Sequence, residues 1–133
     1  MIHSVLAVLA GFVAMSLIVM IATALAVRFV LRMPLATMRS QVPGRLSAAY
    51  LATNVAASGL AALVGGYTTA VLAEHDLVGH GLALAAVMVV MGVVSARQSG
   101  AAQPRWYQVL LITLMPALAV GGAALCSAMQ ASR

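Results

Sequence analysis

The stretch 65-GGYTTAVLAEHDLVGHG-81 decides how this chain folds, because it is a short polar interruption between two long apolar runs. It holds both acidic residues of the 133-residue sequence and two of its three histidines. Asp76 and Gly79 are common turn and helix-start residues, so the stretch predicts the tip of a helical hairpin. The crowding of ionisable groups also leaves open a metal or proton site at this tip.

The composition of the whole chain is typical of a protein whose solvent is lipid. Apolar residues make up 64% of the sequence and charged residues 7%. Soluble domains are about 45–50% apolar and about 25% charged. Seven basic and two acidic side chains cannot cover the surface of a water-soluble fold of this length.

Four segments without Lys, Arg, Asp or Glu have about the length that a helix needs to cross the ~30 Å hydrocarbon core. They cover residues 4–27, 48–73, 79–96 and 106–129. Backbone groups in lipid must be satisfied within each segment, and the runs do not alternate as β-barrel strands do. The sequence therefore predicts an all-α, polytopic four-helix bundle with one membrane domain over residues 1–133. The first segment is expected to be a retained helix, since its apolar run is longer than that of a signal peptide.

Arginines at the segment ends indicate the orientation in the membrane. Because basic loops stay inside, loops 28–47 and 97–105 are predicted to be cytoplasmic and both termini to lie outside, in a bacterial inner membrane. Trp106 and Tyr107 are expected to anchor the last helix at the interface. This distribution argues against nucleic acid as a partner and favours lipid headgroups. Six of the seven arginines belong to these loops: Arg28, Arg32, Arg39, Arg45, Arg97 and Arg105.

One face of the second segment carries small and polar residues at every fourth position. Such residues let membrane helices approach closely and form hydrogen bonds across the contact. Asn54 and Ser58 are expected to make interhelical hydrogen bonds, with contact to a substrate or ion as the alternative. In the last segment, Pro116 is expected to bend the helix, and the glycine pair that follows permits a close crossing. The full stripe is Asn54, Ser58, Ala62, Gly66 and Ala70, and the glycine pair is Gly121 and Gly122.

No ionisable residue lies in the middle of a segment, which excludes several kinds of membrane protein. Four-helix multidrug exporters need a glutamate in the first helix, and haem cytochromes need histidines within the helices. Quinone-linked disulfide enzymes need cysteine pairs, whereas Cys126 is the single cysteine and is expected to be a small packing residue. We therefore expect no enzymatic activity and no cofactor, and we expect bound lipid.

The hairpin tip and the N-terminus share one side of the predicted topology. His3, His75, Asp76 and His80, with Glu74, are therefore candidate ligands for a transition metal such as zinc or copper. Their spacing matches no specific metal motif, and solvated turn residues are the simpler interpretation.

The last seventy or so residues resemble a recurrent pattern in uncharacterised small bacterial four-helix integral membrane proteins. The resemblance implies a membrane location and no activity. It is carried by Gly65, Gly66, Tyr67, His80, Pro104, Trp106, Tyr107, Pro116, Gly121 and Gly122.

The expected function is non-catalytic: an accessory or assembly subunit packed in a larger membrane complex, or self-associated, with lipid and other membrane proteins as partners. The reason is a large apolar perimeter combined with small-residue faces. A small oligomeric transporter or channel, with Asn54 and Ser58 lining its path, is the alternative. A metal-binding membrane protein is a further alternative.

Overall fold

A computed structural model of the protein describes residues 2–25, 28, 48–73, 76–99 and 103–132. Four α-helices run over Ile2–Leu25 (α1), Ala48–Leu72 (α2), Leu77–Ser99 (α3) and Arg105–Ala131 (α4). The apolar spans within them have mean hydropathies of 2.8, 1.6, 2.3 and 2.2, and each is long enough to cross a bilayer. The predicted all-α fold with four helices of membrane-spanning length is therefore confirmed.

The helix boundaries differ from the predicted ones by a few residues. α1 begins at Ile2 rather than at residue 4, and residues 26 and 27 lie outside the described part. α2 ends at Leu72 rather than 73, and α4 runs from Arg105 to Ala131 rather than over 106–129. α3 covers Leu77–Ser99 rather than 79–96. The end of α3 and both ends of α4 are longer because arginine and glutamine, which an apolar run does not include, are good helix formers.

Asp76 sets the start of α3. Its Oδ1 accepts a hydrogen bond from the backbone N–H of Gly79 at 3.1 Å, and its carbonyl accepts one from the N–H of His80 at 3.1 Å. This is an N-cap, in which a side-chain oxygen satisfies a free amide of the first turn. Asp76 has a φ of 49°, in the left-handed region that aspartate tolerates better than most residues. Gly79, predicted as a helix-start residue, therefore lies inside the first turn.

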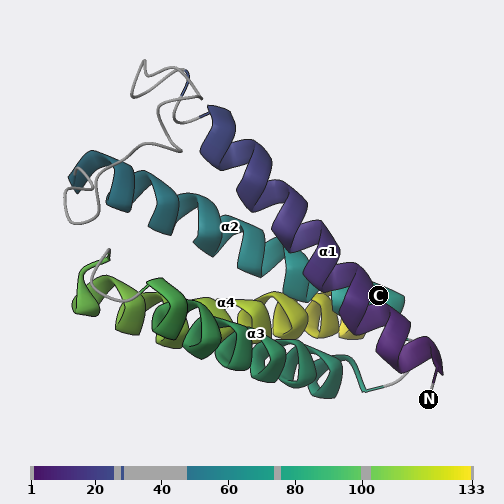
Figure 1. Ribbon diagram of the computed structural model, residues 1–133. Helices are drawn as coiled ribbons and strands as arrows, with labels where there is room; N and C mark the ends of the chain where they lie inside the picture. Colours follow the sequence, from purple (N-terminus) through teal and green to yellow (C-terminus); the bar gives the residue numbers. More distant parts are fainter. Residues whose placement is uncertain (1, 26–27, 29–47, 74–75, 100–102, 133) are drawn as a thin grey trace.

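The helices pack in the order α1, α2, α4, α3, with extensive contacts between successive members and few between α1 and α3 (Figure 1). The first residues of α1 and α3 and the last residues of α2 and α4 lie at one end of the bundle, called the termini end here. The opposite end is the loop end. α1 crosses the other helices obliquely and diverges from α3 and α4 toward the loop end (Figure 1).

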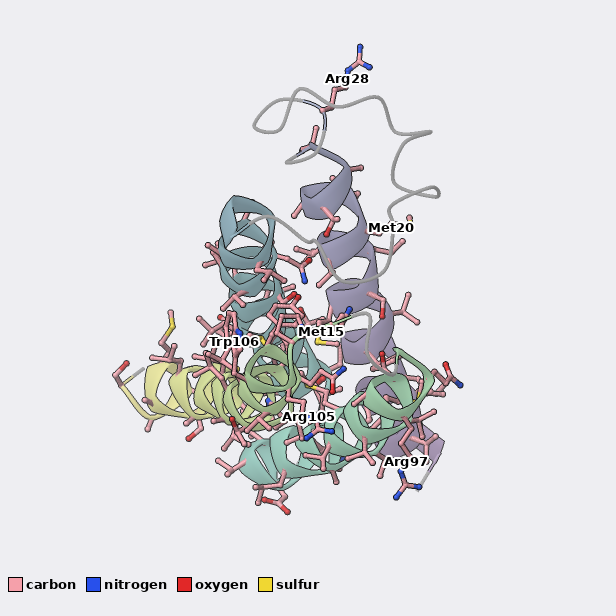
Figure 2. The ribbon with its side chains drawn as sticks, turned by 60° about the vertical axis from the view of Figure 1, so that its left-hand side comes forward. Met15, Met20, Arg28, Arg97, Arg105 and Trp106 are labelled. Atoms are coloured by element: carbon pink, nitrogen blue, oxygen red, sulfur yellow. The ribbon has the colours of Figure 1, made fainter. Side chains whose placement is uncertain are left out.

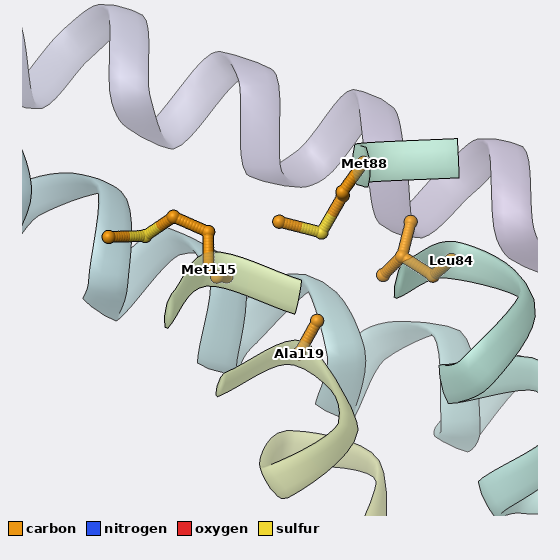
Figure 3. Close-up of a cluster of buried hydrophobic side chains, with 5 residues drawn as sticks. Leu84, Met88, Met115 and Ala119 are labelled. Atoms are coloured by element: carbon orange, nitrogen blue, oxygen red, sulfur yellow. The ribbon is translucent and has the colours of Figure 1, made fainter. Parts of the chain in front are cut away.

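Alanine, leucine and methionine fill the middle of the bundle. The largest cluster of buried side chains joins α2, α3 and α4, and α1 packs against it through Val8, Phe12 and Met15. Figure 3 shows this cluster from within the bundle. Its members are Ala62, Leu84, Met88, Met115 and Ala119.

The closest approach is between α2 and α4. A Cβ on Gly66 would overlap the carbonyl oxygen of Ala119, and one on Gly122 would overlap the carbonyl oxygen of Leu63. A Cβ on the neighbouring Gly121 would meet Leu63 Cδ2 at 3.9 Å, an ordinary contact. Of the glycine pair, Gly122 therefore makes the close crossing, as small residues do in membrane helices.

α1 meets α2 closely where Gly11 faces Gly65 and Thr69. A Cβ on Gly11 would overlap the Thr69 hydroxyl oxygen. Thr69 is fully buried, and its hydroxyl donates to the Gly65 carbonyl of its own helix at 2.9 Å. The polar group is thereby satisfied inside α2, and α1 can pack directly on it.

Candidate functional site

The five stripe positions of α2 lie in different surroundings. Ala62 and Ala70 are fully buried, and Gly66 is buried against α4. Ser58 and Asn54, one and two turns nearer the loop end than Ala62, are half-buried. The stripe therefore runs from packed backbone near the termini end to polar side chains near the loop end.

Asn54 links three helices through hydrogen bonds. Its Oδ1 accepts a hydrogen bond from the Thr23 hydroxyl of α1 at 3.3 Å. Its Nδ2 donates to the phenol oxygen of Tyr107 on α4. We call these three residues the loop-end polar network. In an apolar environment such bonds fix the relative position of helices, because the groups have few other partners.

Tyr107 corrects one prediction. It was expected beside Trp106 as an interfacial anchor, but its side chain is 1% exposed and Trp106 is 59% exposed. Successive helix residues point about 100° apart, and the side of α4 that carries Tyr107 faces Asn54 of α2. The rings contact edge to face, with centroids 5.9 Å apart. Trp106 keeps the position of an anchor, whereas Tyr107 belongs to the interior.

One cavity of about 310 Å³ receives residues from all four helices. We call it the loop-end cavity. Its wall contains Ser58 from the stripe and four methionines, among them Met15 of α1, which Figure 2 labels. Its lining carries no ionisable side chain. The lining residues are Phe12, Met15, Val19, Ser58, Met88, Met91, Gly92, Ser95, Leu111 and Met115.

A second space, of about 540 Å³, lies between α1 and α3 near the termini end. We call it the termini-end groove. It differs from the cavity in having ionisable groups, Asp76 and His80, at its rim. Its lining residues are Val5, Val8, Leu9, Asp76, Gly79, His80, Ala83 and Val87.

An apolar contact separates the groove from the cavity. Val8 lines the groove and Phe12 lines the cavity, and both pack against the cluster that contains Leu84 and Met88. Both spaces therefore lie along the same α1–α3 seam, on either side of this contact.

The candidate metal ligands are only partly described. Among the residues that the structure describes, no group of three His, Cys, Asp or Glu side chains could hold a metal. Glu74 and His75 lie outside those residues, and for His3 the description is limited to its place in α1. His80 Nδ1 lies 2.9 Å from the Asp76 carbonyl oxygen, so Nδ1 carries the proton and Nε2 is the free nitrogen.

The remaining predicted residues sit at helix ends or inside α4. Arg97 lies in the last turn of α3 and Arg105 begins α4, and both are exposed (Figure 2). Arg32, Arg39 and Arg45 lie outside the described residues. α4 continues through Pro116, which is buried, as is Cys126.

Sequence reasoning missed Thr23 and Tyr107 as partners of Asn54, and it missed the methionine lining. A signal for the network does exist. Thr23, Asn54 and Tyr107 each lie within about two turns of an arginine-bearing segment end, hence at similar depth. Polar residues at equal depth on three helices are candidates for one hydrogen-bonded group.

Comparisons with protein-family models, with curated proteins and with solved structures found no match to this chain. The resemblance to small bacterial membrane proteins therefore stays an expectation, and the functional argument depends on the geometry alone.

Proposed function

We propose that the chain is a non-catalytic, multi-pass integral membrane protein that serves as an accessory or assembly subunit in a larger membrane complex. The observation that supports this is the surface of α1. Its span has the highest mean hydropathy, 2.8, yet 11% of the span is buried, against 39% for the α2 span. Water-soluble proteins rarely expose contiguous apolar patches above a few hundred Å².

The exposed face of α1 is regular enough to receive another helix. Large apolar side chains recur along it at helical spacing, and each is about half exposed or more. Lipid covers such a face, and a neighbouring helix covers it equally well, since packing between membrane helices depends on shape. The face comprises Leu6, Leu9, Val13, Leu17 and Met20.

The test is the size and composition of the native particle. We expect the protein to copurify with defined membrane proteins in mild detergent. Leu17→Trp should weaken that association, because the larger ring disturbs the packing of a neighbouring helix on the α1 face. Val90→Trp, on the exposed face of α3, is the matched control because it adds the same ring elsewhere. A lone monomer from native membranes would contradict the proposal.

The proposed location is the bacterial inner membrane, with both termini outside and residues 28–47 and 97–105 in the cytoplasm. Arg97 and Arg105 at the loop end support this orientation. In a Cys126→Ser background, an impermeant maleimide should label Ser132→Cys in intact cells lacking the outer membrane. It should label Gln103→Cys only after permeabilisation. The reverse labelling pattern would show that the orientation in the membrane is opposite to the proposed one.

A small oligomeric carrier is the second candidate function. The observation in its favour is the pair of spaces along the α1–α3 seam, separated by an apolar contact. Proteoliposomes with a fluorescent phosphatidylcholine in one leaflet test this candidate. A carrier should transfer the lipid between leaflets at a rate that Asn54→Leu changes, whereas no transfer above that of empty liposomes would exclude this cargo.

A metal-binding membrane protein is the third candidate function, with His75, His80 and Asp76 as the predicted ligands at the hairpin tip. Metal analysis of the purified protein, beside the His75→Ala and His80→Ala double variant, tests it directly.

A further inference from the structure

The loop-end cavity has the size of a binding site for a small apolar molecule. A cavity of roughly 150 Å³ lined by apolar side chains binds benzene. The loop-end cavity, at about 310 Å³, is about twice that size. It therefore has room for two rings, or for a chain of similar volume.

The walls of the cavity favour an uncharged occupant. No ionisable side chain lines the cavity, and a charge at membrane depth costs at least ~2.5 kcal/mol when unpaired. Met15, Met88, Met91 and Met115 supply flexible, polarisable walls that adapt to different shapes. These properties suit a neutral apolar body rather than an ion.

Two hydroxyl side chains, Ser58 and Ser95, line the cavity, and Ser58 is the more buried of them. Thr68, Thr69 and Thr113 each donate to a carbonyl of their own helix at 2.8 to 2.9 Å. Ser58 is half-buried, lines the cavity and makes no hydrogen bond to any other residue that the structure describes. A hydroxyl in an apolar space is stabilised by an acceptor, which a ligand can provide.

The geometry also defines how a ligand enters. Thr23, Asn54 and Tyr107 lie one helical turn beyond Val19, Ser58 and Leu111, so the polar network lies on the loop-end side of the cavity. On the α1–α3 side, Met91 and Ser95 are exposed and form the mouth. The mouth opens on the side of the bundle, and in a membrane that side faces lipid.

From these observations we propose that the loop-end cavity binds an uncharged, membrane-soluble carbonyl compound of about two-ring size. The compound enters from the bilayer between α1 and α3, and its carbonyl oxygen accepts a hydrogen bond from the Ser58 hydroxyl. This site is independent of the accessory role, because it requires no partner protein.

Benzophenone is a suitable probe, since it is a neutral two-ring ketone that inserts into nearby C–H bonds on illumination. The full-length protein in lipid nanodiscs would be labelled over a concentration series and the labelled methionines mapped by mass spectrometry. We expect saturable labelling of the cavity methionines Met88 and Met115, and non-saturable background at the exposed Met20 and Met129.

Three variants and two competitors test the chemistry. Ser58→Ala should weaken the saturable labelling about fivefold, the loss of about one neutral hydrogen bond. Ser16→Ala is the matched control, because that hydroxyl donates to the Phe12 carbonyl of its own helix and should leave labelling unchanged. Ser95→Phe at the exposed mouth should block labelling without altering the core. Other diaryl ketones should compete better than diphenylmethane, which has the same two rings and no oxygen.

Two results would overturn the proposal. Labelling spread evenly over cavity and exposed methionines, without saturation, would show that no site exists. Saturable labelling that Ser58→Ala leaves unchanged, and that diphenylmethane blocks as well as a ketone does, would show that the carbonyl compound is the wrong class.

Discussion

Between α2 and α4, the backbone at Gly66 and Gly122 touches the facing helix, whereas α1 and α3 meet through side chains and leave a groove and a cavity. The tight pair, α2 and α4, includes the least apolar span, α2, with a mean hydropathy of 1.6. The loose pair, α1 and α3, contains the two most apolar spans, at 2.8 and 2.3. In lipid, apolar character alone gives helices no reason to pack on one another. Close contact depends on small residues, and Val, Leu and Met hold α1 and α3 apart.

The space for a ligand follows from the same difference. At Gly66 and Gly122 the facing backbones leave no room for a side chain, and the space of about 390 Å³ between α2 and α4 lies nearer the loop end, along Leu51, Val55 and Trp106. Where methionine and branched side chains meet, the gaps between them add up to the loop-end cavity and the termini-end groove. A bundle that was tight on every side would have neither.

The largest expected effect is at the tight pair. Gly122→Leu would drive a side chain into the Leu63 carbonyl and should destabilise the protein by about 3 kcal/mol, measured by SDS-induced unfolding in micelles. Gly121→Leu, one residue away, should cost less than about 1 kcal/mol because that position has room. Equal losses for the two variants would show that the α2–α4 contact is not as close as described.

The next effect concerns the polar network that joins α1 to the tight pair. Asn54→Leu removes two interhelical hydrogen bonds and should cost about 1.5 kcal/mol in the same assay. Combined with Tyr107→Phe, the total should fall short of the sum, since both changes break the same bond. Thr113→Val, whose hydroxyl bonds within its own helix, is the control. Additive losses of stability would show that Tyr107 and Asn54 do not interact.

A smaller effect is expected at the cap on the loose pair. Asp76→Ala should cost about 1 kcal/mol, because the Gly79 amide loses its acceptor, and Asp76→Asn should retain most of the stability. Hydrogen exchange of the first turn of α3 should rise with Asp76→Ala more than exchange at the helix centre does. A uniform rise in exchange along α3 would indicate that Asp76 stabilises the whole helix and not only its first turn.

The smallest effect should come from filling the loose seam. Ala83→Leu, in the lining of the termini-end groove, should change stability by less than about 0.5 kcal/mol, since the added side chain enters existing space. The same unfolding assay measures it. A loss comparable to that of Gly122→Leu would show that α1 and α3 pack as tightly as α2 and α4.

The sequence predicted the four helices because length and apolar runs determine them. It did not predict the order of packing, because apolar residues cover every face of these helices and periodicity then indicates no inward side. The burial of Tyr107 could have been found. It lies one and two turns before Leu111 and Met115, on the face that continues to Ala119 and Gly122.

The site was predictable in part. The α2 stripe pointed to Asn54 and Ser58, and the structure places the first in a hydrogen-bonded network and the second in a cavity wall. The different surroundings of these two residues depend on α1 diverging from α3, which no local pattern encodes. The methionines of the cavity were not recognised for the same reason, since their shared lining results from four separate helices.

The neutrality of the loop-end cavity and its polar network has an electrical consequence. A transmembrane voltage acts on a conformational change by about 2.3 kcal/mol per elementary charge per 100 mV. The cavity lining and the polar network beside it carry no charge, so widening or narrowing the cavity moves no charge across the field. Energising or depolarising the membrane should therefore leave the occupancy of this space unaltered.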